Sequence, residues 1–116
     1  YFPLNQKDNF NDLFKTGTSS RDPAFYACVP TKSDQSLAPP SKHILYALVP
    51  VSNLSLDSRP SDNQARLRAH VLEKLGSHFG TDIKDRIETE ASFGPTDFAN
   101  AYNLTHGAAF GLSRRF

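Results

Sequence analysis

Two apolar runs joined by a polar, proline-rich connection dominate the hydrophobic pattern of this chain. The first run, residues 24–29, stands between Pro23 and Pro30, and both prolines favour the ends of a strand because they cannot donate to a ladder. The second run, residues 43–49, is apolar at nearly every position. That pattern predicts a second strand that is buried on both faces, or buried on one of them by a partner domain.

The connection between the two runs, residues 31–42, is too long for a tight hairpin turn. It contains Pro39 and Pro40, which reduce the entropy lost when the segment becomes ordered. We therefore expect a defined excursion of the chain rather than a floppy loop.

The longest helical pattern lies at residues 61–79, where Leu67, Val71, Leu75 and Phe79 recur every four residues beside Leu72. The expected start is a capping box formed by Ser61 and Gln64, and the expected end is Gly80.

Two shorter helices are predicted on either side of this one. Phe10, Leu13 and Phe14 have helical spacing behind a cap at Asp8 or Asn9. Near the other end, Pro95 or Thr96 opens a helix that continues to Tyr102 and carries Phe98 and Ala101.

Residues 86–93 alternate between polar and less polar side chains, which predicts a half-buried third strand. The element order is then helix, strand, strand, helix, strand, helix. This order is typical of an α+β fold, with a small antiparallel or mixed sheet and helices packed on one face.

Composition supports one soluble globular domain over residues 1–116. The chain is 38% hydrophobic and 22% charged, with a net charge of +1. Its basic residues are not clustered, so we expect no nucleic-acid partner. The longest apolar run is far shorter than the roughly twenty residues of a spanning helix. The first residues, without methionine, together with the apolar residues 103–116, suggest a fragment of a longer polypeptide whose other parts cover the tail.

The spacing of the histidines and the single cysteine indicates no catalytic site and no metal site. His70 and His78 stand eight apart on the predicted long helix, too far for one ion, and neither His43 nor His106 adds a ligand set. Cys28 is the sole cysteine and lies in an apolar run, which favours a buried free thiol. We therefore expect no metal site and assign no catalytic residue.

Aromatic residues are the one suggestive feature, and core packing is the first interpretation of them. The set that is able instead to line an apolar channel comprises Phe25, Tyr26, Tyr46, Phe93, Phe98, Tyr102 and Phe110.

Several segments of the chain form a recognisable series. They are Asp22-Pro23-Ala24-Phe25-Tyr26, Val29-Pro30-Thr31, Asp34-Gln35-Ser36-Leu37-Ala38-Pro39-Pro40, Leu48-Val49-Pro50-Val51, Gly94-Pro95-Thr96-Asp97-Phe98, Asn103-Leu104 and Gly107-Ala108-Ala109-Phe110-Gly111-Leu112. In this order they resemble the carotenoid (phytoene) desaturases, and most of all the fungal ones. The segments are spread over residues 22–112, which is about three quarters of the chain.

The resemblance implies a fragment of the substrate domain of an FAD-dependent flavoprotein with an amine-oxidase-like fold. Such enzymes introduce double bonds into the C40 precursor phytoene while associated with a membrane. The implied partners are therefore an apolar polyene, a membrane surface and the remainder of the polypeptide, at an intracellular endomembrane in a fungus.

Under the resemblance, Tyr26, Tyr46, Phe98 and Phe110 become candidates for lining a substrate cavity, while core packing remains an equal alternative. The dinucleotide fingerprint and the C-terminal flavin-contacting segment are absent, so the fragment alone is expected neither to hold FAD nor to catalyse. Two other functions stay open: a related carotenoid oxygenase or saturase, and a free-standing α+β module that binds a partner protein.

Overall fold

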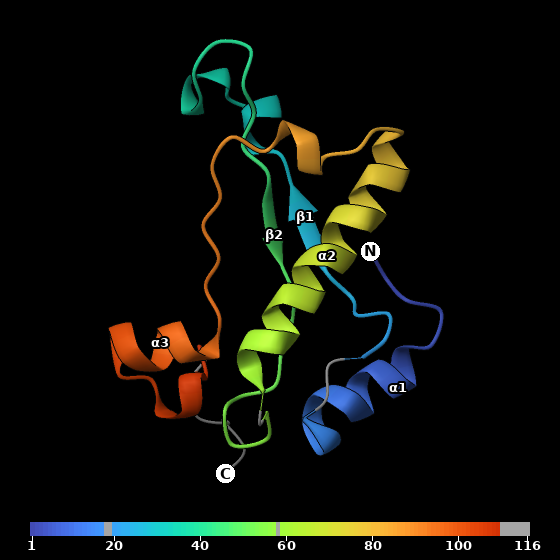
Figure 1. Ribbon diagram of the computed structural model, residues 1–116, viewed down its shortest axis with the longest axis vertical. Helices are drawn as coiled ribbons and strands as arrows, with labels where there is room; N and C mark the ends of the chain where they lie inside the picture. The colour runs from blue at the N-terminus through green and yellow to red at the C-terminus, as the bar shows by residue number, and fades with distance from the viewer. Residues whose placement is uncertain (18–19, 58, 110–116) are drawn as a thin grey trace.

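The computed structural model describes residues 1–17, 20–57 and 59–109 and has an α+β architecture. Figure 1 shows a two-stranded ribbon crossed by one long helix, with a short helix on either side of that pair. The helices are α1 (Gln6–Asn11), α2 (Pro60–Phe79) and α3 (Pro95–Tyr102), and the strands are β1 (Tyr26–Cys28) and β2 (Tyr46–Leu48). The predicted fold class is confirmed at this level, and the sheet is antiparallel.

The core lies between α2 and the inner face of the ribbon. Phe25, Val71 and Leu75 are buried there, and Ala27, Val49 and Ile83 pack against them. The predicted apolar stripe of α2 is confirmed at Leu67, Val71, Leu72 and Leu75, but Phe79 is half exposed. The helix thus covers the inner face of β1.

The ends of α2 show how local chemistry sets its length. Gly80 adopts a φ of 67° and ends the helix as predicted. The predicted capping box is wrong, because Arg59 is the N-cap residue and Pro60 occupies the first turn. Buried Asp57 organises this end instead, since its Oδ1 accepts hydrogen bonds from the Arg59 amide at 2.9 Å and the Asn63 side chain at 2.8 Å.

The two short helices also depart from the predicted caps. Asn5, and not Asp8 or Asn9, caps α1, because its side chain accepts a hydrogen bond from the Asp8 amide. A π-helical turn, Asp12–Thr16, continues α1, so the predicted Phe10, Leu13 and Phe14 cluster is helical throughout. The predicted helix at Pro95–Tyr102 is confirmed, with the Asp97 carboxylate accepting from the Gly94 amide at 2.7 Å.

The excursion between the strands is ordered, as predicted. It contains two 3-10 turns, Pro30–Lys32 and Gln35–Leu37. The base of the excursion is closed by Thr31, which is 1% exposed and whose hydroxyl lies 3.0 Å from His43 Nδ1. The Thr31 hydroxyl also accepts a hydrogen bond from the Ile44 amide at 3.3 Å. Thr31 therefore joins the two ends of the excursion.

The prediction of a third strand is wrong, and the second strand forms but is not buried within this chain. No strand forms in residues 86–93 within the described part of the chain; a 3-10 turn, Lys84–Arg86, precedes an extended segment without ladder hydrogen bonds. The second run is not buried on both faces by this chain, because every residue of β2 is exposed. An apolar strand this exposed is consistent with the alternative prediction that a partner domain covers it.

The molecule is extended for its length. Its radius of gyration is 15.7 Å, whereas a compact domain of this size has about 13 Å. Large hydrophobic residues remain exposed on several elements, among them Phe2, Phe10, Phe14 and Tyr102. The described part of the chain covers only a fraction of its own apolar surface.

Candidate functional site

The outer face of the ribbon is the candidate site, because it brings two predicted residues together. Tyr26 pairs with Leu48 and Cys28 with Tyr46 in the antiparallel register. Directly opposed residues in a ribbon share a face, so all four side chains lie on one side. The intervening pair, Ala27 and Ala47, belongs to the other face, where Ala27 packs against the core.

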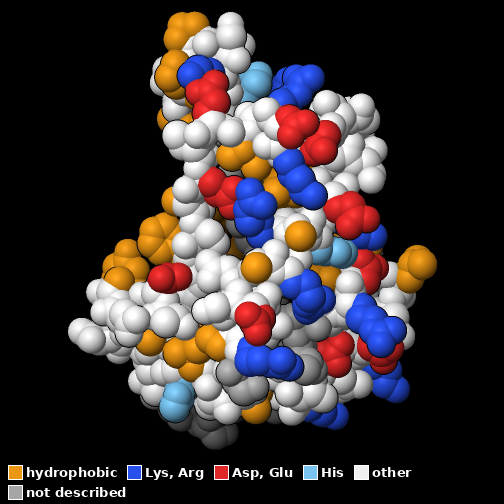
Figure 2. Space-filling model, viewed as in Figure 1, with side chains coloured by type: hydrophobic (Ala, Val, Ile, Leu, Met, Phe, Trp, Pro, Cys, Tyr) orange, Lys and Arg blue, Asp and Glu red, His pale blue; other side chains and the backbone are white. Residues whose placement is uncertain are grey.

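This outer face, defined by Tyr26, Cys28, Tyr46 and Leu48, is open in this chain. Tyr26 is 58% exposed, Tyr46 50% and Leu48 47%, while Cys28 is half-buried rather than fully buried as predicted. Figure 2 views the molecule from the side of α2, so the outer face is turned away from the viewer, and it shows further hydrophobic side chains at the edge of the molecule beside the segment that leads to α3. An exposed aromatic and aliphatic face is suited to binding an apolar ligand or a covering element.

Two of the three polar side chains of the outer face, Tyr26 and Cys28, interact with each other. A hydrogen bond with Cys28 raises the pKa of the Tyr26 hydroxyl, and the neighbouring Tyr46 adds to the effect. The raised pKa keeps the Tyr26 phenol neutral at neutral pH, and none of the four members of the face is an acidic or basic residue of the Asp, Glu, Lys, Arg or His type. Such a surface can bind an uncharged hydrocarbon without desolvating an ion.

The other two predicted cavity residues are not part of this arrangement. Phe98 lies on α3, half-buried, with its ring centroid 6.1 Å from that of Tyr102. Phe110 lies outside the described residues. Two hollows on the described surface, one beside α1 and one at the start of α2, include neither Tyr26, Tyr46 nor Phe98 in their linings. Leu48 was missed by the sequence analysis, although its spacing from Tyr46 places it on the same face of a strand.

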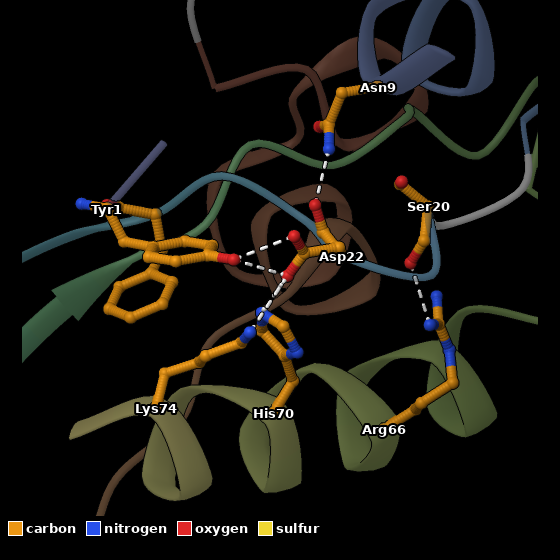
Figure 3. A network of polar contacts seen from close by, with 8 residues as sticks. Tyr1, Asn9, Ser20, Asp22, Arg66, His70 and Lys74 are labelled. Atoms are coloured by element: carbon orange, nitrogen blue, oxygen red, sulfur yellow. Dashed lines mark hydrogen bonds and ion pairs between the residues drawn. The ribbon is translucent and has the colours of Figure 1, made fainter. Parts of the chain in front are cut away.

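A polar cluster around Asp22 anchors the start of the first apolar run (Figure 3). The Tyr1 hydroxyl donates to the Asp22 carboxylate at 2.6 Å, and Lys74 Nζ lies 3.4 Å from its Oδ1. Asn9 donates to the Asp22 carbonyl at 2.7 Å. The hydrogen bond from Tyr1, followed by the contacts with Lys74 and His70, holds the pKa of the Asp22 carboxyl below its usual value. The cluster joins the N-terminal segment, α1 and α2 around β1.

His70 is the buried member of this cluster. Its Nε2 lies 3.5 Å from Asp22 Oδ1 but makes no hydrogen bond, and its side chain is 12% exposed. Burial lowers the pKa of the imidazole, against the smaller opposing effect of Asp22. No group of three or more His, Cys, Asp or Glu side chains suited to a metal occurs among the described residues. The cluster is a structural anchor.

We predict that His70 titrates below its ordinary value of 6.5, as measured from the imidazole chemical shifts by NMR. A lowered pKa means that the unfolded chain binds more protons than the native protein. The stability linked to His70 is therefore complete above pH 6.5 and is lost as the pH falls below it. Asp22→Asn removes the charge that favours the imidazolium, so the pKa of His70 should fall further. A pKa at or above 6.5 in the unmodified protein would contradict the burial argument.

Comparison with curated proteins gives the class to which this chain is related. It is 36% identical over 111 residues to a carotenoid 3,4-desaturase of Haloarcula japonica, an alignment that covers 96% of this chain. It is 35% identical over 116 residues to a zeta-carotene-forming phytoene desaturase of Myxococcus xanthus, covering 99% of the chain. It is 34% identical over 111 residues to a 4,4'-diapophytoene desaturase of Staphylococcus aureus, covering 91%.

The chain is therefore a homologue of one segment of the carotenoid desaturases, which confirms the resemblance. It spans 22% of the length of each of these three relatives. The three come from an archaeon and two bacteria, so they give no support to a fungal character. No family model and no solved structure matches the chain.

Proposed function

We propose that this chain is a piece of an FAD-dependent carotenoid desaturase that introduces double bonds into phytoene, the C40 precursor of carotenoids. The observation that carries the proposal is identity of 34–36% to three desaturases over 91–99% of the chain. The names of the three relatives give different desaturation reactions, but all three are carotenoid desaturases. The chemistry of desaturation is therefore a better supported proposal than the identity of the polyene.

The proposed role of this piece is to shape the substrate domain of an amine-oxidase-like flavoprotein. The sequence holds no dinucleotide fingerprint. We therefore assign the FAD site to parts of the enzyme outside these 116 residues. When bound there, FAD would accept the hydrogens removed from the polyene.

The outer face of the ribbon is the proposed wall for the polyene. A hydrocarbon offers no hydrogen-bonding groups, so its binding depends on burial of apolar area at about 25 cal/mol per Å². Tyr26, Tyr46 and Leu48 present such area on one rigid face whose other side is fixed to α2. Phe98 and Phe110 remain proposed contributors to the same cavity.

A membrane surface is the proposed location of the substrate. No helix in the described ranges has the length and apolar character needed to cross a bilayer. The apolar side chains exposed on β2 and at Phe2 supply surface for peripheral contact with lipid or with other parts of the enzyme. We propose a peripheral association with an intracellular membrane.

The test is alanine substitution in the full-length desaturase that contains this chain. Tyr46→Ala removes about 60 Å² of apolar contact, which corresponds to about a tenfold loss in kcat/KM for phytoene. Phe79→Ala, at an aromatic residue that is 52% exposed at the end of α2, is the matched control and should leave kcat/KM within twofold. Equal effects of the two substitutions on kcat/KM, with flavin content unchanged, would show that the outer face does not contact the substrate.

A further inference from the structure

Side-chain contacts hold the segment formed by residues 87–93, which bends at Glu88. Figure 1 shows it as an extended trace that runs to the start of α3. Arg68 of α2 donates to both carboxylate oxygens of Glu90, from Nε at 2.5 Å and from Nη2 at 2.6 Å. Gln64, one turn earlier on α2, donates to the Ser92 hydroxyl at 2.7 Å. Lys42 pairs with Glu88.

These contacts fix which way the alternate side chains point. Glu90 and Ser92 are bound by α2, so the intervening residues of an extended segment point away from that helix. The residues on that other side are Thr89, Ala91 and Phe93, all exposed, and Phe93 is 66% exposed. The polar side chains of this segment thus have their partners within the chain. The less polar side chains on the opposite side have no covering element among the described residues.

The backbone of this segment is also unpaired. Within the described residues, no backbone hydrogen bond involves an amide or a carbonyl of residues 88–93. Backbone groups in an extended row are the template on which another strand adds. Unpaired charges on a free strand edge commonly prevent another strand from pairing with it. Here the carboxylates of Glu88 and Glu90 form ion pairs with Lys42 and Arg68.

We propose that residues 87–93 are a preformed strand that pairs with a strand from the part of the desaturase outside these 116 residues. The inference rests on the proposed function, because each of the three relatives has more than three quarters of its length outside the matched segment. A two-stranded ribbon is marginal by itself, so a substrate domain built on it needs further strands. The added strand would cover Thr89, Ala91 and Phe93 on one face while α2 holds the other.

Hydrogen exchange followed by NMR on the full-length desaturase tests this pairing. Successive amides of a strand point to opposite edges, so one neighbouring strand protects every second amide. We expect an alternating subset of the amides of residues 88–93 to exchange at least about 100-fold more slowly than unpaired backbone. Uniform exchange at the unpaired rate, or protection that rises with protein concentration because a second copy supplies the strand, would overturn the proposal.

Substitution at position 91 provides the matched pair. Ala91→Pro removes one amide, and Ala91→Thr keeps it with a residue that favours strands. The threonine variant should retain the alternating protection, and the proline variant should lose at least about tenfold of it at the neighbouring protected amides. If the proline variant keeps the same protection at the neighbouring amides as the threonine variant, strand pairing is contradicted. Flavin content and phytoene conversion are measured on the same samples, so an active flavoenzyme with unprotected amides would refute the strand alone and leave the proposed function standing.

Discussion

Phe25→Ala is expected to lower the free energy of unfolding by about 3–4 kcal/mol. Phe25 is 6% exposed and packs against Val71 and Leu75, so truncation leaves a cavity between the ribbon and α2. Its ring is also stacked on that of Tyr1, with centroids 5.3 Å apart. The same substitution therefore weakens the contact that holds the N-terminal segment next to Asp22.

Urea denaturation measures this effect, with Phe2→Ala as the control. Phe2 is 81% exposed, so its truncation removes little packing within this chain and should cost less than about 0.5 kcal/mol. Similar losses for the two variants would show that Phe25 is not a core residue.

Gly107→Ala is expected to destabilise the protein strongly, although it adds a single methyl group. A Cβ at this position would lie 2.0 Å from the Pro95 carbonyl oxygen, and the residue has a φ of 67°. The backbone of the 3-10 turn Thr105–Gly107 would have to move away from the start of α3. We expect a loss of about 3 kcal/mol or more, because strain at positive φ adds to a backbone overlap.

Gly80→Ala separates these two causes. Gly80 has the same φ of 67°, but an added Cβ meets no atom within 4 Å. Its substitution should therefore cost only the left-handed conformation, about 1–2 kcal/mol. Denaturation midpoints that shift equally for the two variants would show that overlap with the Pro95 carbonyl adds nothing to the cost of Gly107→Ala.

The sequence predicted those elements whose signals are local. The period of Leu67, Val71 and Leu75 placed α2, Gly80 ended it, and Pro95 opened α3. The prolines on either side of the first apolar run bounded β1. In each case a residue's own backbone preference agrees with its packing, which is the condition under which a local pattern determines structure.

Other predictions failed or stayed open because they depended on contacts with distant residues. Gln64 was expected to cap α2 but binds Ser92, 28 residues away. Alternation in residues 86–93 correctly indicated an extended segment, yet no strand of the described chain pairs with it. Burial of the second run could not be decided from its sequence, because the prediction depended on what lies against β2.

The candidate site was predicted in part. The sequence placed Tyr26 and Tyr46 in separate strands, and only the register with Cys28 and Leu48 brings them onto one face. Phe98 belongs to another element, because α3 packs mainly against the turn that follows it. Period-two spacing identifies the face within each strand, but the pairing across strands requires the three-dimensional structure.

The central claim is tested most directly by the reaction of the full-length polypeptide that contains this chain. The protein is purified, its flavin is measured by visible absorption, and it is incubated with phytoene in lipid vesicles. We predict bound FAD and a product that has lost hydrogens in pairs, seen by mass spectrometry together with absorption at longer wavelengths from extended conjugation. A flavin-free protein that leaves phytoene unchanged, or a product that has gained oxygen without losing hydrogen pairs, would contradict the account.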